Sequence, residues 1–136
     1  MDPQADLRRL TTRAAATLLV AVLVGCTVLP GAGTVTVGVY GREGWEPSTD
    51  LVLQIDDRTF DGFGGLASAE VTGLVDVYVI ERDTCESRIG FRADPGSRHL
   101  IRLGADDVEV RELVADEPMD AGPLLGAVPP LDCPAR

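Results

Sequence analysis

Apolar and polar residues alternate through much of the chain after residue 34, and this alternation limits the fold more than any other feature of the sequence. The segment 34–40 places three valines at alternate positions, and the segment 51–55 does the same with two leucines and an isoleucine. A repeat of two residues is typical of a β-strand with one buried face, whereas an amphipathic helix repeats every 3.6 residues. Both segments are therefore predicted to be half-buried strands.

Four further segments show the same alternation. They are 71–80, 88–93, 99–103 and 107–113. Between the second and third of these lies the sequence Asp-Pro-Gly-Ser at 94–97. Proline presets the first central position of a β-turn and glycine allows the positive φ of the second, so a type II turn is expected, and with it a hairpin.

Six short strands separated by turn residues predict an all-β fold, a small antiparallel β-sandwich over residues 34–116. The strand, Asp-Pro-Gly turn and strand at 91–103 resemble prealbumin-like and immunoglobulin-like modules, and this resemblance implies a fold but no activity. Residues 117–136 hold five of the nine prolines and show little alternation. They are predicted to form a Pro-rich C-terminal tail.

The N-terminal 25 residues have the order of a bacterial signal peptide. Arg8, Arg9 and Arg13 precede an apolar run at 14–24, and a glycine follows. The run holds 11 residues, fewer than the roughly 18 that a membrane-spanning helix needs. Residues 1–25 are therefore expected to be a signal-peptide helix that is removed on export.

The residues Leu23-Val24-Gly25-Cys26 resemble the lipobox of bacterial lipoproteins. The resemblance implies that the Cys26 thiol receives a diacylglyceryl group and that the chain is cut before Cys26. Two acyl chains anchor a protein far more firmly than one. We expect residues 26–33 to be the lipidated cysteine and a tether, and the protein to be lipid-anchored on the extracytoplasmic face of the cell membrane. The alternative is an uncleaved anchor helix with a chance cysteine.

With Cys26 assigned to lipid, two cysteines remain in a compartment that permits disulfides. They are Cys85 and Cys133. An even number of cysteines in an exported domain favours a disulfide between them, which would tie down the Pro-rich tail. The alternative is two free thiols.

Three carboxylates fall close together in the sequence at Asp56, Asp57 and Asp61. Calcium prefers six to eight oxygen ligands, so this segment is a candidate binding loop. It lacks the alternating spacing and terminal glutamate of an EF-hand, and a solvated β-turn is the favoured interpretation.

Trp45 lies between the first two predicted strands, in the sequence Gly-Arg-Glu-Gly-Trp-Glu-Pro at 41–47. A tryptophan beside an arginine on an exposed loop is typical of an interaction hot spot. The favoured alternative is that Trp45 folds over the end of the sandwich.

Catalytic and metal-binding residues are not recognisable in this chain. His99 is the only histidine, no serine lies in a G-x-S-x-G sequence, and no free cysteine remains to join a histidine at zinc. We therefore predict no catalytic residue, metal or cofactor. The net charge of −10 becomes −11 when residues 1–25 are removed, because they carry three arginines and two aspartates. Such a surface repels phosphate backbones, so nucleic acid is excluded as a partner.

These features predict a non-catalytic binding or scaffolding module at the cell envelope, attached to the membrane through lipid on Cys26 and serving an envelope protein partner. The alternative function is a ligand- or calcium-binding envelope lipoprotein that uses the acidic loops. A small hydrolase is a third hypothesis, which would need carboxylates clustered in a pocket.

Overall fold

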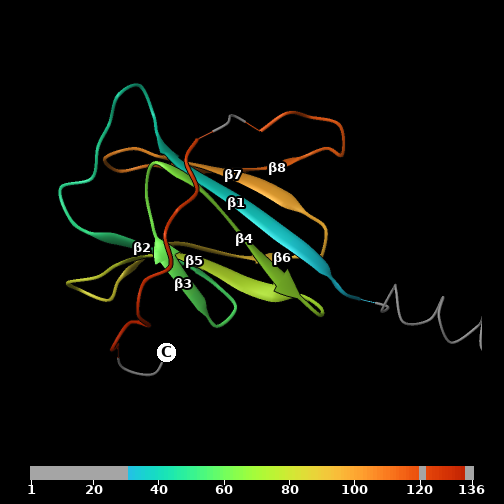
Figure 1. The fold of residues 1–136 in the computed structure, drawn as a ribbon. Helices are drawn as coiled ribbons and strands as arrows, with labels where there is room; N and C mark the ends of the chain where they lie inside the picture. The colour runs from blue at the N-terminus through green and yellow to red at the C-terminus, as the bar shows by residue number, and fades with distance from the viewer. Residues whose placement is uncertain (1–30, 120–121, 134–136) are drawn as a thin grey trace, which may run out of the picture. The chain divides into compact units, whose positions relative to one another are not determined.

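The computed structural model describes residues 31–119 and 122–133, which form eight β-strands in two sheets (Figure 1). The strands are β1 (Gly33–Gly41), β2 (Leu51–Ile55), β3 (Arg58–Asp61), β4 (Gly65–Val71), β5 (Val75–Glu81), β6 (Ser87–Ala93), β7 (Arg98–Leu103) and β8 (Val108–Leu113). The expected signal peptide and Cys26 lie outside the described residues.

Each sheet has four strands, and the prediction of an all-β sandwich is confirmed. One sheet has the order β4-β1-β7-β8 and the other β3-β2-β5-β6. Neighbouring strands are antiparallel except β1 and β7, which are parallel, a pairing that the sequence did not predict. In an immunoglobulin domain the first strand pairs with the second, whereas here β1 lies between β4 and β7. The immunoglobulin-like strand order therefore does not describe this chain.

The core lies between the sheets and contains the alternating residues of the central strands. The predicted inward residues of β1, β2 and β5 are all buried in it, and the full cluster is Val35, Val37, Val39, Leu51, Leu53, Ile55, Ala67, Ala69, Val71, Val75, Val77, Val79, Ala93, Ile101 and Leu103. Because successive residues of a strand point to opposite faces, their neighbours lie on the outer faces.

The predicted strand at 71–80 is in fact the last residue of one strand and all but the last residue of another. β4 ends at Val71 and β5 begins at Val75, in different sheets, and Gly73 between them has a φ of 137°. β3 and β4 were not predicted as strands. The inward residues of β4 include Ala67 and Ala69, and alanine is a weak signal for a strand.

The turn at 94–97 has the predicted type II geometry, but the expected hairpin is wrong. The Ser97 amide donates to the Asp94 carbonyl over 3.1 Å, and Gly96 has a φ of 87°. The flanking strands β6 and β7 lie in different sheets. The reason is that β1 pairs with the segment after the turn: the Thr36 amide donates to the Ser97 carbonyl over 3.1 Å.

The C-terminal tail is ordered along one side of the sandwich, where residues 123–133 form a segment that we call the strap. It makes an antiparallel bridge between Ala127 and Phe60 and a parallel bridge between Leu124 and Leu66. β3 and β4 are edge strands of their sheets. The strap thus covers both edge strands on this side. Without it, these strands would carry unpaired backbone groups.

The burial of the core predicts how two leucine substitutions differ. Leu53 is completely buried, whereas Leu124 in the strap is 77% exposed. Leu53→Ala should lower the free energy of unfolding by about 2–5 kcal/mol because it leaves a cavity, and Leu124→Ala should change it by less than about 0.5 kcal/mol. Urea denaturation of both variants checks this, and equal effects would contradict the assignment of the core.

Candidate functional site

Four connecting loops gather at one end of the sandwich, which we call the loop end. They are residues 42–50, 62–64, 82–86 and 104–107. The Arg42 amide donates to the Leu103 carbonyl over 2.9 Å, and the Gly64 amide donates to the Val39 carbonyl over 2.8 Å. These bonds place loops from different parts of the chain beside one another.

Trp45 is folded over the loop end, as the favoured interpretation predicted. Its amide donates to the Arg42 carbonyl over 2.8 Å, and Glu43 and Gly44 between them have φ values of 45° and 81°. This turn brings the indole ring back onto the sandwich, where it is partly buried against the core. Gly41 is required by the turn, since a Cβ there would lie 2.0 Å from the Trp45 carbonyl oxygen.

The Trp45 ring is held by one aromatic ring and one cation. It meets Phe63 edge to face, with 5.9 Å between ring centroids and 74° between planes. The Arg88 guanidinium carbon lies 5.4 Å from the indole centroid, a cation–π geometry. Arg88 also donates to the Gly104 carbonyl over 2.7 Å. Trp45 is therefore a fixed part of the loop end rather than a free side chain.

Two ion pairs join the loops further. Arg42 pairs with Asp107, and Arg82 pairs with Asp50 at 3.1 Å. All four side chains are at least one-third exposed, so each pair stabilises the fold by no more than about 1 kcal/mol. Their effect is to fix the position of each loop relative to the next.

The loop end is acidic. Its four loops carry seven carboxylates against two arginines, a net charge of −5: Glu43, Glu46, Asp50, Asp83, Glu86, Asp106 and Asp107 against Arg42 and Arg82. Two of the seven are neutralised by the ion pairs described above. The net charge of −5, which already includes the two arginines, favours neutral or basic molecules at this end.

The three aspartates of the predicted acidic turn do not share one loop. Asp56 and Asp57 form the two-residue loop of a hairpin in which Ile55 pairs with Arg58. Asp61 lies at the other end of β3, opposite Val52, and its amide donates to the Gly126 carbonyl over 2.8 Å. The expectation of one solvated β-turn holding all three aspartates is therefore corrected to a turn followed by a strand, because Thr59 and Phe60 pair with β2.

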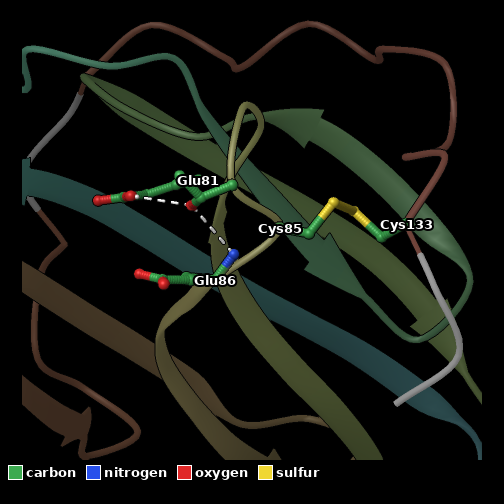
Figure 2. Close-up of a disulfide and its surroundings, with 5 residues drawn as sticks. Glu81, Cys85, Glu86 and Cys133 are labelled. Atoms are coloured by element: carbon green, nitrogen blue, oxygen red, sulfur yellow. Dashed lines mark hydrogen bonds between the residues drawn. A yellow bond between two sulfur atoms is a disulfide. The ribbon is translucent and has the colours of Figure 1, made fainter.

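The predicted disulfide between Cys85 and Cys133 is present (Figure 2). It joins the loop between β5 and β6 to the end of the strap, across a sequence separation of 48 residues. The loop is closed by two backbone bonds: the Cys85 amide donates to the Glu81 carbonyl over 2.9 Å, and the Glu81 amide donates to the Glu86 carbonyl over 2.8 Å. The backbone at Cys85 is thus held by bonds within its own loop as well as by the disulfide.

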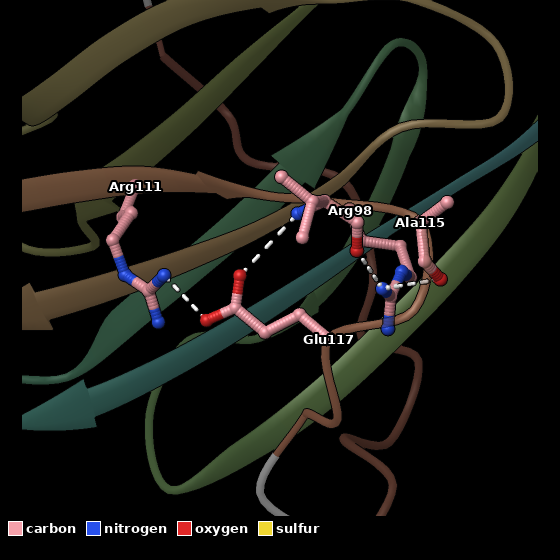
Figure 3. Close-up of polar contacts among 5 residues, drawn as sticks. Arg98, Arg111, Ala115 and Glu117 are labelled. Carbon is pink, nitrogen blue, oxygen red and sulfur yellow. Dashed lines mark hydrogen bonds and ion pairs between the residues drawn. The ribbon is translucent and has the colours of Figure 1, made fainter.

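At the opposite end of the sandwich, the segment after β8 is fixed by charged side chains (Figure 3). Glu117 pairs with Arg111 and accepts the Val114 amide over 3.3 Å. Arg98 donates to the carbonyls of Val114 and Ala115. The hydrogen bond from Arg111 lowers the pKa of Glu117, so this segment keeps its carboxylate partner down to acidic pH.

His99 is packed inside the sandwich beside Phe91 and Ser97. Its side chain is buried, its imidazole packs against Phe91 with 4.8 Å between ring centroids and 49° between ring planes, and its Nε2 lies 2.9 Å from the Ser97 hydroxyl. Burial lowers the pKa of His99, and the nearby charges of Glu112 and Asp94 oppose that shift. The neutral imidazole is therefore the form that fits this position.

In the part of the chain that the structure describes, no group of three or more His, Cys, Asp or Glu residues could hold a metal ion. No helix in residues 31–119 and 122–133 is long and apolar enough to cross a membrane. Comparisons with protein-family models, with curated proteins and with solved structures found no match to this chain.

The buried imidazole predicts an acid-sensitive stability. Because the pKa of His99 is lower in the folded protein than its ordinary value of 6.5, the stabilising neutral form is fully present above pH 6.5. The free energy of unfolding should fall as pH is lowered through 6.5 towards the folded-state pKa, by at most about 1.4 kcal/mol per pH unit for one proton. Urea denaturation between pH 7.5 and pH 5 measures this fall.

The control is His99→Gln, which keeps a hydrogen-bonding side chain but cannot titrate. Its stability should change less over the same pH interval. An identical pH dependence in the variant and the natural protein would show that another group is responsible.

Proposed function

We propose that this protein is a non-catalytic, lipid-anchored binding or scaffolding module of the bacterial cell envelope, attached through lipid on Cys26 at the extracytoplasmic face of the cell membrane. The observation that carries the proposal is the position of β1. This strand begins at Gly33, seven residues after Cys26, and it runs from the end of the sandwich that holds the 94–97 turn to the loop end.

The contacts of β1 support this geometry. Gly33 lies against the 94–97 turn, since a Cβ there would be 2.9 Å from the Gly96 nitrogen. At its other end, β1 leads directly into the 42–50 loop. A strand of nine residues spans about 30 Å, and a seven-residue tether reaches at most about 25 Å. A lipid on Cys26 would therefore hold the end of the sandwich with the 94–97 turn within about 25 Å of the membrane, and we propose that the loop end, about 30 Å further along β1, faces away from it.

The charge of the loop end supports a protein partner over other classes. A net charge of −5 over four fixed loops opposes contact with anionic lipid and with nucleic acid. The partner that fits is a neutral or basic protein surface. Trp45, Phe63 and Arg88 supply a rigid platform behind the acidic side chains.

The alternative of a calcium-binding lipoprotein has no support in the described residues, because Asp56 and Asp61 lie at opposite ends of β3. A small hydrolase is not supported either, since the one histidine is packed between the sheets.

Lipidation is tested by Cys26→Ala. In a bacterial host that makes lipoproteins, the variant should lose acyl labelling and accumulate as the unprocessed precursor, because the modified thiol is needed for cleavage. Metabolic labelling with an alkyne fatty acid and gel mobility measure the two effects. Cys133→Ser is the matched control and should be labelled and processed normally. Processing of Cys26→Ala at the natural site would sink the proposal of an anchor at Cys26.

The binding surface is tested by photo-crosslinking in intact cells. A photoreactive residue in place of the exposed Glu43 at the loop end should give discrete protein adducts, because this end would face away from the membrane. The same residue in place of the exposed Asp57, at the opposite end, is the control and should give none. Equal adducts from both positions, or adducts from position 57 only, would contradict the proposal.

A further inference from the structure

The strap is held to the sandwich by a small set of bonds to two edge strands. On β3, the Asp61 amide donates to the Gly126 carbonyl over 2.8 Å, and the Val128 amide donates to the Thr59 carbonyl over 3.0 Å. The Thr59 hydroxyl donates back to the Val128 carbonyl over 2.7 Å.

On β4 the same segment makes a matching pair of bonds. The Leu66 amide donates to the Pro123 carbonyl over 3.0 Å, and the Leu125 amide donates to the Leu66 carbonyl over 2.8 Å. The strap therefore bridges the two sheets by hydrogen bonding to the backbone of one edge strand in each sheet.

The core does not include the strap. Every residue of the buried cluster between the sheets lies at or before Leu103, and the strap adds only Leu125, which is partly buried against that cluster. Leu124 is 77% exposed. Opening the strap would therefore leave the layer of side chains that holds the sheets together intact.

The last part of the strap is joined to the sandwich by the disulfide. After Val128, the strap passes from β3 to the loop between β5 and β6, where Cys133 is bonded to Cys85.

The disulfide is also placed where another thiol can reach it. Cys85 and Cys133 are both partly exposed, and Cys85 lies in a surface loop. Cys85 has a φ of 60°, a backbone conformation that side-chain-bearing residues disfavour. An accessible disulfide in a loop is open to thiol exchange, whereas one buried in a core is not.

From these observations we propose that the Cys85–Cys133 disulfide is a redox-controlled latch: its reduction releases the strap from β3 and β4 while the sandwich stays folded. The reductant is a dithiol, such as a thiol–disulfide oxidoreductase provides. One of its thiolates attacks a sulfur of the latch and forms a mixed disulfide, and the displaced thiolate takes up a proton. The second thiol of the reductant then attacks the mixed disulfide and displaces the latch cysteine held there. The latch has then gained two electrons and two protons, and the dithiol has become a disulfide.

Release changes the surface of the molecule. It frees backbone groups of two edge strands, namely the Asp61 and Leu66 amides and the Thr59 and Leu66 carbonyls. The latch would thus decide whether these two edges are paired with the strap or open, and this inference does not depend on lipid at Cys26.

Amide hydrogen exchange of the folded protein with and without a dithiol reductant tests the latch. Four amides report on the strap: Asp61, Leu66, Leu125 and Val128. After reduction these amides should exchange at least about tenfold faster. Their exchange rates should depend little on the urea concentration, because they exchange through a local opening. Amides of the central strands β1 and β5 should remain protected and should exchange through the urea-dependent global unfolding.

Two outcomes would overturn the proposal. In one, the strap amides after reduction follow the same urea dependence as the amides of β1 and β5, so that the strap leaves only when the whole protein unfolds. In the other, their exchange is unchanged. A Cys85→Ser/Cys133→Ser double variant is the control for the reductant, and its exchange should not respond to dithiol.

A second variant tests the strap without changing the disulfide. Leu125→Ala removes the one strap side chain that packs on the core. In the oxidised protein it should speed exchange at the Leu66 and Leu125 amides and leave β1 and β5 unaffected. Equal acceleration in all strands would show that the strap unfolds together with the whole domain. That result would contradict the proposal, because a latch needs a strap that opens separately.

Discussion

The two sheets are held together by a single layer of small and medium apolar side chains, and the rest of the structure depends on how closely that layer packs. Its members are valines, alanines, leucines and isoleucines, without one aromatic ring. Close packing of such residues keeps two sheets about 10 Å apart. The larger rings lie at the margins of the layer, where Trp45, Phe60, Phe63 and Phe91 are partly buried against it. They close the openings that two stacked sheets leave at their ends and sides.

Two stacked sheets also have four edge strands, two on each side of the sandwich. The edge strands of the two sides are protected in different ways. On the side of β3 and β4, the strap bonds to both edges and places Leu125 against the core. On the side of β6 and β8, the edge strands carry exposed charged residues, among them Arg92, Glu109 and Arg111. Charges on an edge discourage pairing with other chains. One side is thus protected by a segment of the chain and the other by its surface charge.

The sequence predicted the elements whose signals are local and missed those that depend on pairing. Strands with alternating valine or leucine, such as β1 and β2, were predicted with small errors at their ends. The type II turn at 94–97 was predicted from Pro95 and Gly96. Its flanking strands lie in different sheets because β7 pairs with β1, which is about sixty residues away in the sequence. For Trp45, the turn through Glu43 and Gly44 determines its inward position, and the positive φ of Glu43 has no signal in the sequence. The disulfide needed only a count of cysteines once Cys26 was assigned to lipid.

The position of the disulfide in the sequence bears on what it stabilises. In the simple chain-entropy model, a loop of this length restricts the unfolded chain by roughly 4 kcal/mol, and that effect would be shared by the whole domain. The main core cluster, however, ends at Leu103, and of the strap only Leu125 packs against it. The disulfide joins the end of the strap to the loop between β5 and β6, so its local effect falls on the strap. Opening the strap removes from the main cluster only the packing of Leu125, so the strap is the part of the domain that we expect to open separately when the disulfide is reduced.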